Sequence, residues 1–163
     1  MTAPVTGPGV YDIPADEYHA HPALSSSGAR RLLAPSCPAK FAYEREHGQP
    51  PKRVFDFGRA AHRRVLGVGD DTVVMEADNY RTDAAQQQRD KAYADGKVPI
   101  LPKEDAVINA MAAALKAHPY AGALFDPAQG GRAEQSLFWT DPETGVECRA
   151  RLDWLRATGG GRL

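Results

Sequence analysis

The sequence predicts an α+β or α/β domain in which several helices are followed by a β-hairpin. Apolar residues recur at helical spacing through much of residues 28–118, in segments separated by proline and glycine. Two apolar-rich strand-like segments follow, joined by Asp-Pro-Glu-Thr-Gly at 141–145, a sequence typical of a hairpin loop. A chain of 163 residues has the size of one ordinary domain with a real core. We therefore expect a single domain over 1–163 whose sheet is incomplete at the C-terminal end.

Each predicted helix is bounded by residues that start or stop helices. Ser25, Ser26 and Ser27 offer a hydroxyl N-cap to a short helix, which Pro35 then ends. Gly48 is expected to terminate the helix that follows. The predicted helices cover residues 14–18, 28–33, 38–47, 54–66, 82–94 and 102–118.

Two of these helices differ in their apolar content. The helix at 82–94 is polar with few apolar anchors, and we interpret it as a mobile or partner-facing segment. The helix at 102–118 is the stronger prediction. Its core stripe is expected to consist of Val107, Met111 and Leu115, joined by Ile108.

The predicted strands alternate in side-chain type. They cover residues 10–13, 72–76, 98–101, 133–140 and 146–155, and residues 1–9 are predicted to be a flexible arm. Because the side chains of a strand alternate between its two faces, Glu134, Ser136 and Phe138 share one face of the strand predicted at 133–140. The last strand has an apolar face and an opposite, charged face. That charged face carries Glu147, Arg149, Arg151 and Asp153.

Composition limits the classes of partner and compartment. The formal net charge is −1, so a nucleic-acid partner requires a local basic surface. We see neither an apolar run of about 18 residues nor a signal peptide, which predicts a cytoplasmic protein without a membrane span. Cys37 and Cys148 are isolated from each other in the sequence and are expected to be small buried residues rather than metal ligands or a disulfide.

Three residues on separate elements have the chemistry of a divalent-metal site: His62, Glu134 and Asp153. His62 follows Gly58 by four residues, so the two share a helix face that a ligand can approach. Carboxylates suit Mg²⁺ and Mn²⁺, and Mn²⁺ also accepts imidazole. The alternatives without a metal site are that His62 is a packed or surface histidine and that the hairpin has a solvated charged face.

Two arginines beside these carboxylates are candidates for binding nucleic acid. Arg149 and Arg151 alternate along the face that carries Asp153 and could contact phosphate oxygens. They could equally be salt-bridge partners of Glu147 and Asp153.

Five sequence segments, taken in order, resemble the PD-(D/E)XK nucleases of the RecB/RecE type. The nearest likeness is to the exodeoxyribonuclease VIII-like domain of phages and prophages, and it covers the chain from about Tyr11 onward. The segments are YHAHPALSSS at 18–27, FGRAAH at 57–62, KVPILP at 97–102, AEQSLFW at 133–139 and GVECRARLDW at 145–154. The order and spacing of the segments are more specific than any one of them.

The resemblance implies a fold and a set of site residues. The fold would be restriction-endonuclease-like, with a helical N-terminal part packed on a mixed sheet. His62 and Asp153 would ligate Mg²⁺ or Mn²⁺, and Glu134 would assist as a further catalytic acid. The family's next strand normally supplies an acid-x-Lys pair, which is not found after the strand at 146–155. We therefore expect this chain to be a truncated, inactive form.

The function that the resemblance implies is hydrolysis of phosphodiester bonds at DNA ends in phage-type recombination or repair, which this chain alone is not expected to carry out. The expected partners are linear duplex DNA, further copies of the chain in a homo-oligomer, and a single-strand annealing protein. One alternative is a non-catalytic remnant that acts as a DNA-binding or assembly module. Another is a purely structural phage protein that binds no metal.

Overall fold

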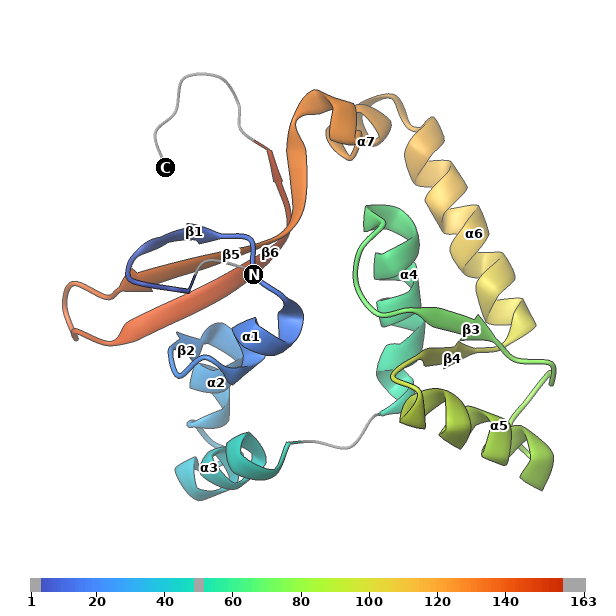
Figure 1. Cartoon of the computed structure of the whole chain (residues 1–163), viewed down its shortest axis with the longest axis horizontal. Coiled ribbons are helices and arrows are strands. Elements are labelled where there is room, and N and C mark those ends of the chain that lie inside the picture. Colours follow the sequence, from blue (N-terminus) through green and yellow to red (C-terminus); the bar gives the residue numbers. More distant parts are fainter. Residues whose placement is uncertain (1–3, 49–51, 157–163) are drawn as a thin grey trace. The chain divides into compact units, whose positions relative to one another are not determined.

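The computed structural model describes residues 4–48 and 52–156, and these fall into two compact units (Figure 1). One unit combines Met1–Pro50 with Ala133–Leu155, and the other combines Pro51–Arg132 with Arg156–Leu163. We call the first the hairpin unit and the second the helical unit. The α+β class predicted from the sequence is confirmed.

The hairpin unit is built on a four-stranded mixed sheet with the order β1-β5-β6-β2. β1 runs antiparallel to β5, with Tyr11 opposite Ser136, whereas β2 runs parallel to β6, with Ser25 opposite Arg149. Segments from both ends of the chain therefore share one sheet. The strands are β1 (Gly9–Tyr11), β2 (Leu24–Ser25), β5 (Gly131–Thr140) and β6 (Glu147–Arg156).

The turn between β5 and β6 is held by Asp141, which confirms the predicted hairpin. The Asp141 main-chain N–H donates to the Val146 carbonyl at 2.9 Å. Its carboxylate accepts hydrogen bonds from the Thr144 hydroxyl at 2.7 Å and the Thr144 N–H at 2.8 Å. These bonds favour the charged form and lower the pKa of Asp141.

Three short helices belong to the hairpin unit, close to their predicted positions: α1 (Ala15–Ala20), α2 (Ser26–Arg31) and α3 (Pro38–His47). The hydroxyl of Ser25 caps α2 by accepting a hydrogen bond from the Gly28 N–H at 3.1 Å. Gly48 ends α3 with a φ of 71°, a value that suits glycine.

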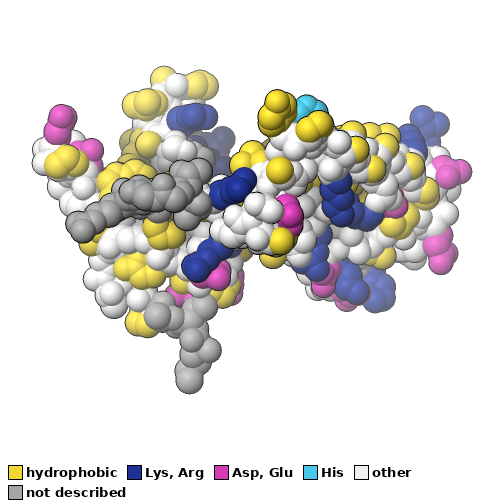
Figure 2. Space-filling model, turned by 90° about the horizontal axis from the view of Figure 1, so that it is seen from above, with side chains coloured by type: hydrophobic (Ala, Val, Ile, Leu, Met, Phe, Trp, Pro, Cys, Tyr) yellow, Lys and Arg dark blue, Asp and Glu magenta, His cyan; other side chains and the backbone are white. Residues whose placement is uncertain are grey.

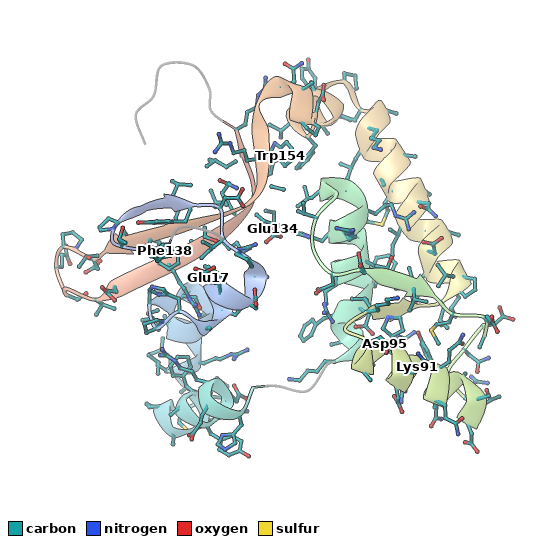
Figure 3. All side chains as sticks on the ribbon, in the orientation of Figure 1. Glu17, Lys91, Asp95, Glu134, Phe138 and Trp154 are labelled. Carbon is teal, nitrogen blue, oxygen red and sulfur yellow. The ribbon has the colours of Figure 1, made fainter. Side chains whose placement is uncertain are left out.

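The core of the hairpin unit lies against β5. It consists of Ile13, Tyr18, Ala23 and Phe138, all less than a tenth exposed. Phe138 and Glu134, labelled in Figure 3, lie on the same strand. Val5 also packs on this core, so part of the predicted arm contacts the sheet. Residues 1–3 of that arm lie outside the described part of the chain.

The helical unit contains a short parallel strand pair surrounded by helices. β3 and β4 pair in parallel with Thr72 opposite Val98, and α5 forms the connection between them. The unit's core consists of Ala60, Val98, Ile100 and Ile108. Its elements are η1 (Arg53–Phe55), α4 (Asp56–Leu66), β3 (Thr72–Val74), α5 (Asp83–Ala94), β4 (Val98–Ile100), α6 (Pro102–Ala117), α7 (Pro119–Leu124) and η2 (Pro127–Gln129).

The polar helix predicted at 82–94 is present as α5. It buries two small residues, Ala85 and Ala92, rather than large apolar side chains. An exposed ion pair between Lys91 and Asp95, with atoms 2.9 Å apart, lies at its C-terminal end (Figure 3). The scarcity of large apolar residues therefore reflects a helix that contacts the core through alanine.

The predicted core stripe of α6 is wrong in part. Val107 and Met111 are 50% and 46% exposed, whereas Ile108 and Ala112 are buried at 1% and 7%. The helix packs against α4 through the face that carries Ile108. Consecutive residues of a helix are about 100° apart around its axis, so the side chains of Val107 and Ile108 point in different directions. Because Ala112 is small, the sequence did not mark the face that carries Ile108 as the buried one.

Two further findings concern expectations from composition. Cys37 is exposed and Cys148 is half-buried, so the prediction that both are buried is wrong for Cys37. Among residues 4–48 and 52–156, no helix has both the length and the apolar character needed to cross a bilayer.

Candidate metal site

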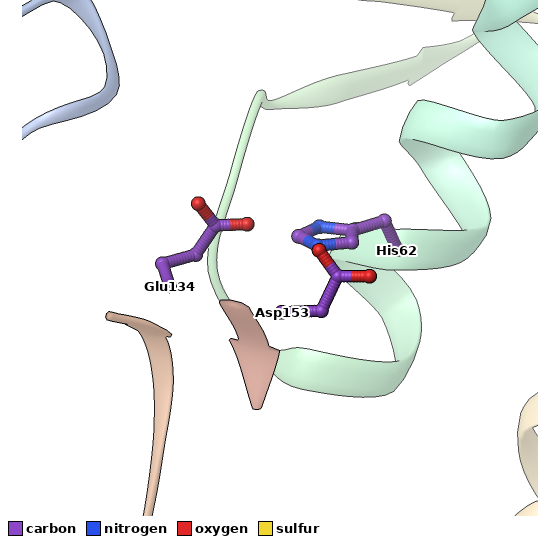
Figure 4. A group of neighbouring side chains, drawn as sticks. All are labelled: His62, Glu134 and Asp153. Atoms are coloured by element: carbon purple, nitrogen blue, oxygen red, sulfur yellow. The ribbon is translucent and has the colours of Figure 1, made fainter. Parts of the chain in front are cut away.

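Glu134 and Asp153 form the carboxylate pair of the hairpin unit. They lie on the neighbouring strands β5 and β6, and a carboxylate oxygen of one is within 4.8 Å of an oxygen of the other. Two negative charges this close repel each other unless a cation or a proton is shared between them. Hard oxygen donors are also the ligands preferred by Mg²⁺ and Mn²⁺. This pair is therefore suited to a divalent cation. Figure 4 draws both carboxylates.

The backbone of Glu134 is in an unusual conformation. Its φ is 57°, and among the described non-glycine residues it alone has a positive value. The left-handed region costs an ordinary residue roughly 1–2 kcal/mol. Such residues in a strand bend the chain locally and re-aim a side chain, and they are frequent at functional sites. The direction of this carboxylate is therefore set by a bend in β5.

Arg151 is the partner that holds Glu134. The two form an ion pair, and their side chains are only 14% and 19% exposed. Arg151 also donates to the Ile13 carbonyl at 3.0 Å and to the Ser136 hydroxyl at 2.9 Å. One of the alternatives considered from the sequence was a salt bridge of Arg151 with an acid of its own strand. The observed partner, Glu134, instead belongs to the adjacent strand.

Arg149 is turned toward α1. It donates to the main-chain carbonyls of Tyr18 and, at 3.3 Å, of His19. Its guanidinium carbon lies 4.6 Å from the centre of the Tyr18 ring. Burial lowers the pKa of Arg149, and the positive charge of Arg45 lowers it further.

Tyr18 was not identified from the sequence as part of this region. Arg151 also lies over its ring, with the guanidinium carbon 5.5 Å from the ring centre. The ring of Tyr18 therefore lies within cation–π distance of both guanidinium groups and favours both positive charges. Burial raises the pKa of the Tyr18 hydroxyl, so it stays neutral. The motif at 18–27 contained the signal, because it begins with this tyrosine.

His62 lies on α4 of the helical unit and is partly buried. A Cβ placed on Gly58, one turn earlier, would have no described atom within 4 Å. A Cβ on Gly69 would instead lie 3.4 Å from His62 Nδ1, so the loop after α4 approaches the imidazole closely. The glycine at 58 therefore leaves open space one turn before His62.

The loop beside His62 is tied to α4 by two arginines. Arg59 pairs with Asp70 at 2.9 Å, and Arg63 pairs with Asp71 at 3.0 Å. Both acids follow Gly69 directly in the sequence. These α4 arginines therefore have carboxylate partners within the helical unit.

Asp56 anchors the N-terminal end of α4. It is 4% exposed, and its Oδ2 accepts a hydrogen bond from the hydroxyl of Tyr93 on α5. Burial is the main cause of a raised pKa at both Asp56 and Tyr93. This pair could not be predicted from residue patterns, because its members are far apart along the chain.

Basic side chains do not gather in one place on the face shown in Figure 2. Lysine and arginine side chains that are described there alternate with apolar and acidic ones. This distribution agrees with the near-neutral composition.

No family model matches the sequence, and no curated protein is significantly similar to it. The candidate site is accordingly described from its own residues.

Proposed function

We propose that the protein is a metal-dependent DNA exonuclease of the exodeoxyribonuclease VIII-like type, acting on the ends of linear duplex DNA. The observation that carries the proposal is the carboxylate pair of Glu134 and Asp153 on neighbouring strands, within 4.8 Å of each other. The bend at Glu134 adds to it, because local strain of this kind favours a functional role.

The residues present fit a divalent cation. Asp153 is exposed and offers oxygen donors, and Glu134 has an orientation fixed by the backbone and by Arg151. The oxygen donors favour Mg²⁺ or Mn²⁺ over softer metals, and His62 is the further ligand that the resemblance to the nucleases implies, a nitrogen donor that Mn²⁺ also accepts. A bound ion of this kind lowers the pKa of a coordinated water and neutralises charge on a phosphate.

The protein's own residues then have distinct tasks. Asp153 would hold the cation, with His62 as the further ligand that the resemblance implies, and Glu134 on the neighbouring strand would orient a water or the cation. Arg149 and Arg151 hold the sheet and α1 together through their carbonyl and carboxylate contacts. In this scheme the two arginines position the acids. Contact with DNA phosphate is proposed only for those of their guanidinium N–H groups that remain exposed.

The fold type belongs to the same proposal. A mixed sheet with acids on two adjacent strands, and a helix with the G-x-x-x-H spacing, is what a restriction-endonuclease-like core would supply. Duplex ends are the proposed substrate, and assembly with further copies or with a single-strand annealing protein would extend the same function.

One observation favours a second candidate, a non-catalytic DNA-binding or assembly module. Arg151 already neutralises Glu134, so a cation would have to compete with a guanidinium for that carboxylate. A remnant that had lost its metal would show the same ion pair.

A Mn²⁺ titration followed by calorimetry distinguishes the two. We expect the wild type to bind Mn²⁺, and Asp153→Asn and His62→Ala to bind it at least about tenfold more weakly. Glu147→Gln is the matched control, because Glu147 is an exposed acid on the same face of β6. Equal binding by the control and by Asp153→Asn would overturn the proposed site.

The activity itself is tested with Mg²⁺ and linear duplex DNA, with closed circular DNA as the control substrate. Release of nucleotides from the linear form alone supports an exonuclease. DNA binding without metal binding or digestion would establish the non-catalytic candidate instead.

A further inference from the structure

A cavity of about 390 Å³ lies within the hairpin unit, beside α2, α3 and β6. It is formed entirely by residues of that unit and lies apart from the carboxylates of Glu134 and Asp153, neither of which lines it. Its polar lining consists of His19, Ser25, Ser27, Arg31, Glu44, Arg45 and Arg149.

The charges around the cavity do not balance. Arg31 is paired with Glu44 at 3.3 Å, which accounts for one arginine and for the acid. Arg45 donates to the Pro22 carbonyl at 3.2 Å, and Arg149 donates to carbonyls of α1. Main-chain carbonyls satisfy hydrogen-bond donors without cancelling a positive charge. The cavity therefore has two arginine charges in excess.

These two charges act on each other. After burial, the positive charge of Arg45 is a cause of the lowered pKa of Arg149. In addition, Arg149 Nε is buried and has no hydrogen-bond partner among the described residues. Two like charges with an incompletely satisfied guanidinium constitute an unfavourable arrangement, which a bound anion would relieve.

Hydroxyl donors lie at the same cavity. The hydroxyls of Ser25 and Ser27 are 3.1 Å apart, and Ser25 already accepts the Gly28 N–H. Gly28 permits this close arrangement, because a Cβ there would lie 3.2 Å from Ser25 Oγ and 3.3 Å from the Phe41 ring. Arginine and serine donors around a space of this size suit a tetrahedral oxyanion.

We propose that this cavity binds a phosphate group, with Arg45 and Arg149 as the charged donors and the serine hydroxyls as neutral ones. The phosphate belongs either to a polynucleotide or to a small free molecule such as inorganic phosphate or a mononucleotide. Only the polynucleotide source rests on the proposed nuclease function.

The first test is a calorimetric titration with inorganic phosphate, with chloride at matched ionic strength as the control for screening. Arg45→Gln is the main variant, since Arg45 is exposed and its loss leaves the carbonyl contacts of Arg149 in place. We expect its affinity for phosphate to fall about tenfold, the usual effect of losing one charge-assisted bond.

Arg30→Gln is the matched control, because Arg30 is an exposed arginine of α2 that does not line the cavity. We expect it to bind phosphate as the wild type does. Absence of phosphate binding in the folded wild type, or equal binding by Arg45→Gln, would overturn the proposal. Thermal melting of each variant identifies any loss of affinity that comes from unfolding.

The second test identifies the source of the phosphate. Short duplexes with a 5′-phosphate, a 3′-phosphate or hydroxyl ends are compared in the wild type and in Arg45→Gln. A preference for one phosphorylated end that disappears in Arg45→Gln assigns the cavity to a polynucleotide terminus. Binding of inorganic phosphate without any preference among the duplexes assigns it to a free ligand.

The two proposals fail separately. Phosphate binding that depends on Arg45, in a protein that neither binds Mn²⁺ nor digests DNA, retains the cavity and rejects the nuclease. Mn²⁺ binding and DNA digestion, together with an unchanged phosphate affinity in Arg45→Gln, retain the nuclease and reject the phosphate cavity.

Discussion

Arg151 on β6 forms an ion pair with Glu134 on β5 and at the same time donates to the main chain of Ile13. One side chain thus connects two strands of the sheet to the segment that precedes α1. Because Arg151 and Glu134 are both largely buried, each contributes to compensating the charge of the other.

Arg151→Met is expected to destabilise the protein strongly. It leaves the Glu134 carboxylate buried without its partner, which typically costs about 3–5 kcal/mol. Urea unfolding measures the loss, with Arg30→Met as an exposed control. The double variant Arg151→Met/Glu134→Gln should recover much of the stability, because it removes both charges. If the double variant is no more stable than the single one, the ion pair is not the cause.

Gly58→Ala is expected to separate stability from function. Alanine is favoured over glycine in a helix by about 1 kcal/mol, and its Cβ would meet no described atom within 4 Å. The free energy of unfolding should therefore rise, whereas DNA binding or digestion should fall if a ligand approaches this face. Gly122→Ala provides the contrast, because its Cβ would collide with the Lys116 carbonyl oxygen and should destabilise α7. A stabilised Gly58→Ala with unchanged DNA affinity would argue against a ligand at this helix face.

Asp56 predicts a pH dependence of stability. Its pKa is raised above the ordinary value of 3.8, chiefly by burial, so the folded form holds this proton more tightly than the unfolded form does. The contribution of Asp56 to stability is therefore complete below pH 3.8 and is lost as pH rises through the raised pKa. In Asp56→Asn, whose amide oxygen can still accept from Tyr93, this loss should disappear.

The measurement is thermal melting of both proteins from about pH 4 to about pH 8. Asp141→Asn serves as a control of opposite sign, because the pKa of Asp141 is lowered and its contribution is lost as pH falls. Parallel curves for wild type and Asp56→Asn would show that the buried carboxyl does not control this dependence.

The two apolar faces of α6 should respond differently to truncation. Ile108→Ala removes a side chain that is 1% exposed, and we expect a loss of about 2–5 kcal/mol. Val107→Ala changes a neighbouring position that is 50% exposed, where the effect should stay within about 0.5–1 kcal/mol. Equal losses of stability at the two positions in urea unfolding would contradict the assignment of the Ile108 face of α6 to the core.

Local structure was the most predictable part of the fold. Ser25, Gly48 and the Asp141 turn act on residues adjacent to them in sequence, so α2, α3 and the hairpin were predicted from residue type, although α2 begins and ends two residues before its predicted bounds. Pairing at a distance was not predictable. The parallel alignments of β2 with β6 and of β3 with β4 depend on tertiary packing, which no single segment encodes.

The candidate site was predicted in the same uneven way. Residue chemistry identified Glu134 and Asp153, because acids that alternate with apolar residues mark one face of a strand. It did not reveal that Arg151 pairs with Glu134, or that Tyr18 lies beneath both arginines. Those contacts require the β5–β6 pairing and the position of α1, which follow only from the folded chain.

The left-handed main chain at position 134 makes that site sensitive to change in a way its charge alone does not. A β-branched residue would be excluded there by crowding, and asparagine or glycine would be accommodated at the cost of the longer acid. An acidic residue at this position must be unbranched at Cβ and must adopt a positive φ. A substitution at position 134 would therefore change both the backbone conformation and the charge of the site.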